Sequence, residues 1–150
     1  MASEKVDILA IGAHPDDVEL SAAGTILKEV ANGKKVAIVD LTQGELGTRG
    51  SKEIRKQEAE LARDFMDAKF RDNLLLDDCF FENNRDNQIK LISKIRRYQP
   101  DIIMCNATDD RHIDHQKAAK LVVDSCFLSG LKKIETTFDG NIQDLSLIHI

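Results

Sequence analysis

The chain has few of the features that mark secreted, membrane or nucleic-acid-binding proteins. It contains three cysteines, two prolines and no tryptophan in 150 residues, and its formal net charge is −5. An acidic chain lacks the broad basic field that captures phosphate backbones or anionic lipid, so we expect neither nucleic acid nor membrane as a partner. No run reaches the roughly 18 apolar residues of a membrane span. The first nine residues, MASEKVDIL, lack the pattern of a signal peptide.

The cysteines are Cys79, Cys105 and Cys126, and each lies within or beside an apolar segment. An odd number of widely spaced cysteines favours buried thiols in a reducing compartment over a disulfide framework. We therefore predict a cytoplasmic protein. The length suits one domain with a real core and is too short for two ordinary ones.

Apolar patterning alternates between short buried runs and longer helical repeats. We predict strands at residues 6–13, 35–42, 73–76 and 101–107, and helices at 18–32, 51–68, 87–98 and 114–130. The apolar helix faces that we predict comprise Leu20, Ala23, Ile26, Leu27 and Val30; Ile54, Leu61, Ala62 and Phe65; and Ala118, Leu121, Val122, Cys126 and Phe127. This alternation predicts an α/β, Rossmann-like, doubly wound fold: a mostly parallel sheet with helices on both faces.

Two polar clusters follow the first and fourth predicted strands. The first is AHPDD at residues 13–17 and the second is DRHIDH at residues 110–115. In the common strand order 3-2-1-4, the first and fourth strands are neighbours, and ligands bind in the crevice beyond their carboxyl ends. We therefore expect these two distant clusters to meet at one site.

The residue types in these clusters suit a catalytic metal site. His14, Asp17 and His115 offer two imidazoles and a carboxylate, a ligand set for zinc or a similar transition metal with a position left for water. Asp16 would lie beside the metal and can serve as a general base. His112 can donate a hydrogen bond or a proton to an oxyanion or a leaving group.

Two further acids are candidates for supporting roles. Asp114 can hold one of the imidazoles, and it would favour protonated His112 if that ring is its neighbour. Glu19 can hydrogen-bond back into the site or act only as an acid near a helix N-terminus. The turn GAHPDD lacks the G-x-G-x-x-G of dinucleotide-binding folds. The clusters therefore favour metal-assisted hydrolysis of an amide or ester.

At these residues the sequence resembles the LmbE-like (PIG-L) family of zinc-dependent N-acetyl sugar deacetylases. The shared signature is AHPDD-x-E together with a later H-x-D-H, here residues 13–19 and 112–115. Within the family it looks most like the N-acetylglucosaminyl-malate deacetylases of bacillithiol biosynthesis, through VDLTQGELGTRGS, IRKQEA and DDRHIDHQKAAKLV. The likeness extends over about residues 5–144.

The resemblance implies specific roles for these residues. It makes His14, Asp17 and His115 the zinc ligands, Asp16 the general base, and His112 the group that stabilises the oxyanion and assists departure of the amine. The reaction it implies removes acetate from an N-acetylglucosamine conjugate. The malate moiety carries two carboxylates, and the arginines that we expect to face it are Arg49, Arg55 and Arg111.

Several alternatives stay open at this stage. The substrate can instead be another N-acetylglucosamine conjugate or a chitooligosaccharide, and the ligand set also accepts Fe²⁺, Co²⁺ or Mn²⁺. A protein of another class, a metal- or sugar-binding module without turnover, would be expected to lack Asp16 or His112. The resemblance further implies a homo-oligomer at full length.

The carboxyl-terminal end departs from the family pattern. We interpret residues 1–144 as a deacetylase domain whose C-terminal portion is missing, and residues 145–150, LSLIHI, as a non-native tail. His149 is therefore excluded from the metal site.

Overall fold

The computed structural model describes residues 4–145. Its main sheet has four parallel strands in the order β3-β2-β1-β4. The strands are β1 (Ile8–Gly12), β2 (Val36–Thr42), β3 (Phe70–Leu76) and β4 (Ile102–Met104). The helices are α1 (Asp17–Ala31), α2 (Lys52–Phe65), α3 (Arg85–Tyr98) and α4 (Ile113–Ser129). A separate antiparallel pair, β5 (Thr137–Phe138) and β6 (Asn141–Ile142), follows α4.

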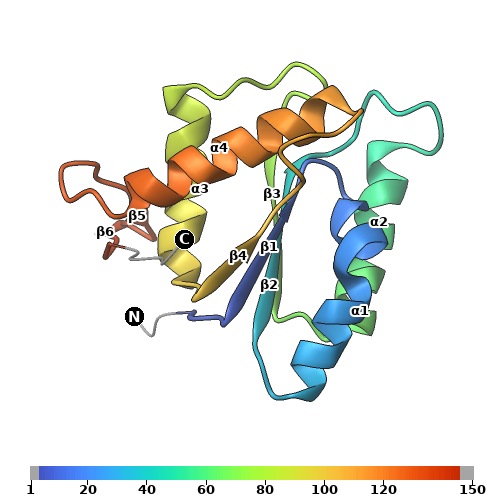
Figure 1. Ribbon diagram of the computed structural model, residues 1–150, viewed down its shortest axis with the longest axis horizontal. Helices are drawn as coiled ribbons and strands as arrows, with labels where there is room; N and C mark the ends of the chain where they lie inside the picture. Colours follow the sequence, from blue (N-terminus) through green and yellow to red (C-terminus); the bar gives the residue numbers. More distant parts are fainter. Residues whose placement is uncertain (1–3, 146–150) are drawn as a thin grey trace.

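The helices form one layer on each face of the sheet (Figure 1), with α1 and α2 on one side and α3 and α4 on the other. Alternate side chains of a strand point to opposite faces, so β1 contributes to two separate cores. Leu9 and Ile11 pack in the cluster on the α3–α4 side. Ile8 and Ala10 pack in the cluster on the α1–α2 side. Burial on both faces explains the continuous apolar runs of β1 and β2.

The predicted fold class and strand order are confirmed. The main differences lie at element boundaries. The third strand is longer than predicted and begins at Phe70, while the fourth is shorter and ends at Met104. β4 is an edge strand and pairs only with β1. The antiparallel pair β5–β6 was not predicted.

The predicted apolar faces of the helices are partly wrong. Of the apolar residues predicted on α2, Ile54, Leu61 and Phe65 are exposed, and the helix instead packs through Ala59 and Ala62. Small residues let α2 approach the sheet closely, whereas its large apolar residues point outward. Leu20 and Leu27 on α1 and Phe127 on α4 are exposed as well.

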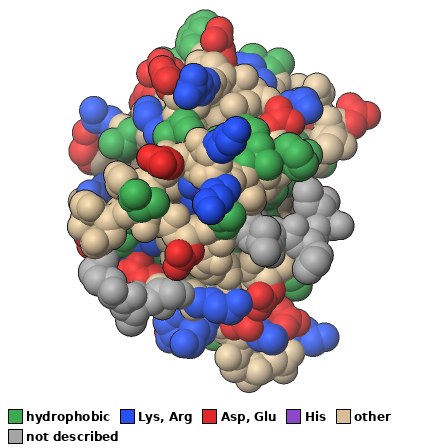
Figure 2. Space-filling view, turned by 90° about the vertical axis from the view of Figure 1, so that its left-hand side faces the viewer, with side chains coloured by type: hydrophobic (Ala, Val, Ile, Leu, Met, Phe, Trp, Pro, Cys, Tyr) green, Lys and Arg blue, Asp and Glu red, His purple; other side chains and the backbone are tan. Residues whose placement is uncertain are grey.

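The cysteine prediction holds only in part. None of the three forms a disulfide, but Cys105 is exposed because it follows the open edge strand β4. On the face shown in Figure 2, basic and acidic side chains are interspersed, with no extended patch of one sign. Within residues 4–145, no helix has both the length and the hydropathy needed to cross a bilayer. Most of the predicted tail, residues 146–150 with His149, lies outside the described residues.

Candidate metal and catalytic site

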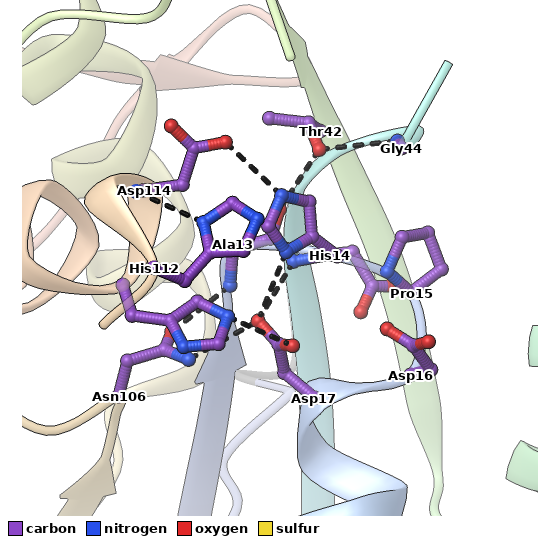
Figure 3. A network of polar contacts seen from close by, with 12 residues as sticks. Ala13, His14, Pro15, Asp16, Asp17, Thr42, Gly44, Asn106, His112 and Asp114 are labelled. Carbon is purple, nitrogen blue, oxygen red and sulfur yellow. Dashed lines mark hydrogen bonds and ion pairs between the residues drawn. The ribbon is translucent and has the colours of Figure 1, made fainter. Parts of the chain in front are cut away.

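The two polar clusters meet beyond the carboxyl ends of β1 and β4 (Figure 3). His14 follows β1, Asp17 begins α1, and His115 lies in the first turn of α4. One ligand atom from each of these three side chains lies within 4.8 Å of the other two. The predicted convergence is therefore present, because parallel pairing of β1 with β4 brings their following loops to one edge.

The three predicted ligands are oriented toward one another. His14 turns Nδ1 toward Asp17 Oδ2, at 3.5 Å, and His115 turns Nε2 toward Asp17 Oδ1, at 3.2 Å. Asp17 Oδ2 also accepts hydrogen bonds from the His14 backbone N–H at 3.0 Å and from Asn106 Nδ2 at 3.1 Å. Asn106 follows β4, so it braces the Asp17 carboxylate from the second cluster's side.

The far nitrogen of each histidine ligand is held by carboxylates. His14 Nε2 lies 3.0 Å from Asp114 Oδ2 and 3.1 Å from Asp78 Oδ1. His115 Nδ1 lies 2.9 Å from Asp110 Oδ2. Metal-binding histidines characteristically donate their second N–H to a carboxylate in this way, which fixes the tautomer and makes the ligating nitrogen more basic. The donor set therefore fits a zinc ion bound by His14 Nδ1, His115 Nε2 and Asp17.

Surrounding charges shift the pKa values of the buried pair His14 and Asp17. Burial alone would lower the pKa of His14, but the carboxylates of Asp17, Asp114 and Asp78 outweigh it and raise the pKa to about 9. Burial would likewise raise the pKa of Asp17, but its hydrogen bonds to His14 and Asn106 lower it to about 2. Without a metal, the site therefore holds a protonated imidazole beside an ionised carboxylate.

His112 is the N-cap of α4, and its Nδ1 accepts a hydrogen bond from the Asp114 backbone N–H at 3.2 Å. Nε2 is then the ring nitrogen that is left to donate a hydrogen bond. The ring is exposed and stacks on His115, with ring centroids 4.8 Å apart. The carboxylate of Asp114 lies 3.0 Å from His14 Nε2, so the imidazole that it holds is that of His14.

Asp16 lies beside this group with its carboxylate 55% exposed, and Arg55 Nη2 contacts its Oδ1 at 3.1 Å. Arg55 Nη1 also donates to the Gly44 carbonyl at 3.0 Å. Gly44 has φ +62, and a Cβ built there would lie 1.9 Å from Arg55 Nη1. Gly44 is therefore needed both for its backbone conformation and for the path of Arg55 to Asp16.

The other predicted residues lie outside this group. Arg49 and Arg111 are exposed, and within residues 4–145 neither makes a side-chain ion pair or hydrogen bond. Glu19 bonds to Arg71 instead of pointing back into the site. Three partners were missed from sequence: Asp78, Asn106 and Asp110. Asp110 lies within the second cluster, which could have suggested it, whereas Asp78 lies in a loop without a recognisable motif.

Comparison with known proteins agrees with this fold. The family profile described as PIG-L, GlcNAc-PI de-N-acetylase, matches residues 9–126. The conserved protein TT1542 from Thermus thermophilus superposes with a TM-score of 0.84 at 34% identity, covering 90% of this chain and 61% of that one. The N,N'-diacetylchitobiose deacetylase from Pyrococcus horikoshii superposes with a TM-score of 0.77 at 28% identity, covering 83% of this chain and 51% of that one.

A curated relative gives a similar result. The diacetylchitobiose deacetylase of Thermococcus kodakarensis is 26% identical over 134 residues, which cover 83% of this chain and 50% of that protein. The chain thus spans about half to three fifths of the length of these relatives. The matched residues include the first cluster, the glycine-rich loop QGELGTRG at residues 43–50 and the second cluster. From the extent of that match, the chain belongs to the PIG-L (GlcNAc-PI de-N-acetylase) family.

Proposed function

We propose that the protein is a metal-dependent deacetylase that removes the N-acetyl group of an N-acetylglucosamine conjugate. The observation that carries this proposal is the pair of histidines whose far nitrogens are held by carboxylates while their near nitrogens face Asp17. A zinc ion held there supplies a Lewis acid that polarises a carbonyl and makes water more acidic. Two of the relatives above are diacetylchitobiose deacetylases, which supports the same reaction class.

The chain's own residues have distinct roles in this proposal. Asp16 takes a proton from the attacking water, and Arg55 orients its carboxylate. His112 donates its Nε2–H to the carbonyl oxygen as negative charge develops there. When the carbon–nitrogen bond breaks, the amine nitrogen takes up the proton held at Asp16, assisted by His112. The products are acetate and the free amine.

For the substrate, we propose N-acetylglucosaminyl-malate, with diacetylchitobiose or another N-acetylglucosamine conjugate as the alternative. Arg49 and Arg111 are exposed, are without ion-pair partners among residues 4–145, and can meet the malate carboxylates. Arg55 is the weaker candidate for that role, since it already contacts Asp16 and Gly44. The cytoplasmic location and the homo-oligomer stay predictions.

The test is acetate release from N-acetylglucosaminyl-malate, N-acetylglucosamine and diacetylchitobiose, measured side by side. We expect chelation to abolish release, and Asp16→Asn to abolish turnover while leaving metal content unchanged. Full activity of Asp16→Asn would reject the assigned base. Arg111→Glu should slow only the malate conjugate; an equal effect on diacetylchitobiose would reject the malate assignment.

A further inference from the structure

Arg71, on β3, makes an unusually complete set of contacts for a buried charged side chain. Its side chain is 5% exposed. A guanidinium has five N–H donors, and all five have partners. Nε and Nη2 bind Asp40 at 2.8 and 3.0 Å, Nη1 binds Glu19 and the Ala59 carbonyl, and Nη2 also reaches the Pro15 carbonyl at 3.1 Å.

These contacts join four parts of the fold at one point. Asp40 is on β2, Ala59 on α2 and Glu19 on α1, while Pro15 lies in the turn between β1 and α1. Asp40 is buried and would be an unpaired charge without Arg71. Arg71 thus links β2, β3 and α2 to the turn that carries Asp16.

That turn needs an external support. Asp16 is the N-cap of α1, yet its side chain makes no capping hydrogen bond, although N-cap aspartates normally accept one from the first turn. Its carboxylate instead pairs with Arg55. The two Arg71 contacts at Pro15 and Glu19 bracket Asp16 and Asp17 in sequence, so they fix the backbone on both sides of these two residues.

We propose that Arg71 is a positioning residue of the deacetylase proposed above. It holds the turn so that Asp16 reaches the attacking water and Asp17 faces the two histidines. Within residues 4–145, Arg71 makes no hydrogen bond or ion pair with His14, Asp17 or His115. The two polar clusters do not indicate Arg71, because Arg71 lies on β3 and acts through the Pro15 carbonyl and the Glu19 side chain.

The test replaces Arg71 by lysine, which keeps the charge but cannot bond Asp40, Glu19 and Pro15 together. The matched control is Arg96→Lys. Arg96 is also buried and bonded to several carbonyls, those of Ser129, Leu131 and Ile134, at the far end of α4. Two assays are made on each variant: the kinetics of acetate release, which give kcat and KM, and a titration that gives the dissociation constant for Co²⁺.

We expect both variants to melt at lower temperature, and only Arg71→Lys to change the site. Its kcat should fall about 10- to 100-fold with KM within about twofold, since small misplacements of catalytic groups have effects of this size. Its Co²⁺ affinity should fall about tenfold. A fall in either quantity that Arg96→Lys does not share supports the proposal. Equality of the two variants in both quantities would overturn it.

Two cases need a separate test: an unmodified protein without activity, and an Arg71→Lys variant that does not fold. If the unmodified protein releases no acetate from any substrate, the proposed function fails, and the Co²⁺ measurement alone decides the role of Arg71. If Arg71→Lys does not fold, Glu19→Gln replaces it, with Glu4→Gln as its control. Glu4 also pairs with an arginine, Arg97, but outside the site. Unchanged Co²⁺ affinity and kcat in Glu19→Gln, relative to Glu4→Gln, would then reject the proposal.

Discussion

Replacing Gly44 by alanine tests whether the glycine-rich loop sets the position of Arg55. Two effects are expected. At φ +62 an alanine is strained, at a cost of about 1 kcal/mol. The new Cβ would also lie 1.9 Å from Arg55 Nη1, so the guanidinium must leave its place against Asp16. Because Asp16 is half exposed, losing this ion pair adds only about 0.5 kcal/mol.

The control is Gly33→Ala, which isolates the backbone effect. Gly33 has φ +85, and a Cβ there would meet nothing within 4 Å. A loss of 1 kcal/mol lowers the melting temperature of a chain of this size by about 2–4 °C. We therefore expect a fall of about 3 °C for Gly33→Ala and about 5 °C for Gly44→Ala. Differential scanning calorimetry at one pH and metal concentration measures both.

Activity separates the two variants more strongly than stability does. Gly44→Ala should lower kcat about tenfold, because Asp16 loses its orienting partner, and Gly33→Ala should leave kcat unchanged. In an Arg55→Met background, Gly44→Ala should cause little further loss, as expected when two changes break the same contact. The reasoning is refuted if Gly44→Ala leaves kcat intact, or if its effect is fully retained without Arg55.

Two further predictions concern the metal site. Asp114→Asn should weaken zinc binding about 10- to 100-fold, because His14 loses its carboxylate partner. Competition with a chromophoric chelator measures the zinc affinity. The control is Asp124→Asn, on the same helix but paired with Lys120, which should bind zinc as the unmodified protein does. In the metal-free protein, folding raises the pKa of His14 from 6.5 to about 9, so the protonated imidazole stabilises the folded state. This contribution to the free energy of unfolding is complete below pH ~6.5 and is lost as the pH rises toward about 9. Urea unfolding with chelator present should therefore show stability falling over that range, and an equal fall in His14→Gln would contradict the assignment.

The convergence of the two clusters could be predicted from sequence because it depends on topology alone. Once βα alternation fixes a parallel sheet of order 3-2-1-4, the loops after β1 and β4 must share an edge. The individual distances need not be known. The same reasoning located His14, Asp17 and His115, whose placement depends only on being next to those strand ends.

Asp78 could not be predicted in this way. It lies after β3, two strands away from β1 in the sheet, and it reaches His14 only because the loop turns back over the site. Two non-glycine residues along this path have positive φ: Leu75, near the end of β3, at 55°, and Cys79, in the loop, at 63°. Left-handed backbone at such residues is disfavoured locally and is imposed by the surrounding fold. Hydrophobic periodicity carries no signal for such a path.

The prediction that Ile54, Leu61 and Phe65 of α2 are buried was wrong for a different reason. Periodicity identified a real amphipathic pattern at Ile54, Leu61 and Phe65, but these residues are exposed, and nothing in residues 4–145 covers them. The face turned toward the sheet carries Ala59 and Ala62 together with Arg55, and the Ala59 carbonyl accepts a hydrogen bond from Arg71. Helical spacing identifies an apolar stripe, and only the tertiary contacts decide which stripe is buried.

The arrangement of carboxylates also explains why the two histidines present different nitrogens. His14 Nε2 contacts Asp114 and Asp78, so Nδ1 is the nitrogen that faces Asp17. His115 Nδ1 contacts Asp110, so Nε2 is the nitrogen that faces Asp17. A protonated His14 satisfies its neighbours by donating from both nitrogens, so a proton and a cation compete for the same position. A divalent cation contributes more positive charge to this acid-rich site than the proton that it displaces. The carboxylates that raise the pKa of His14 thereby also favour metal binding, and the two effects should weaken together when any of these acids is neutralised.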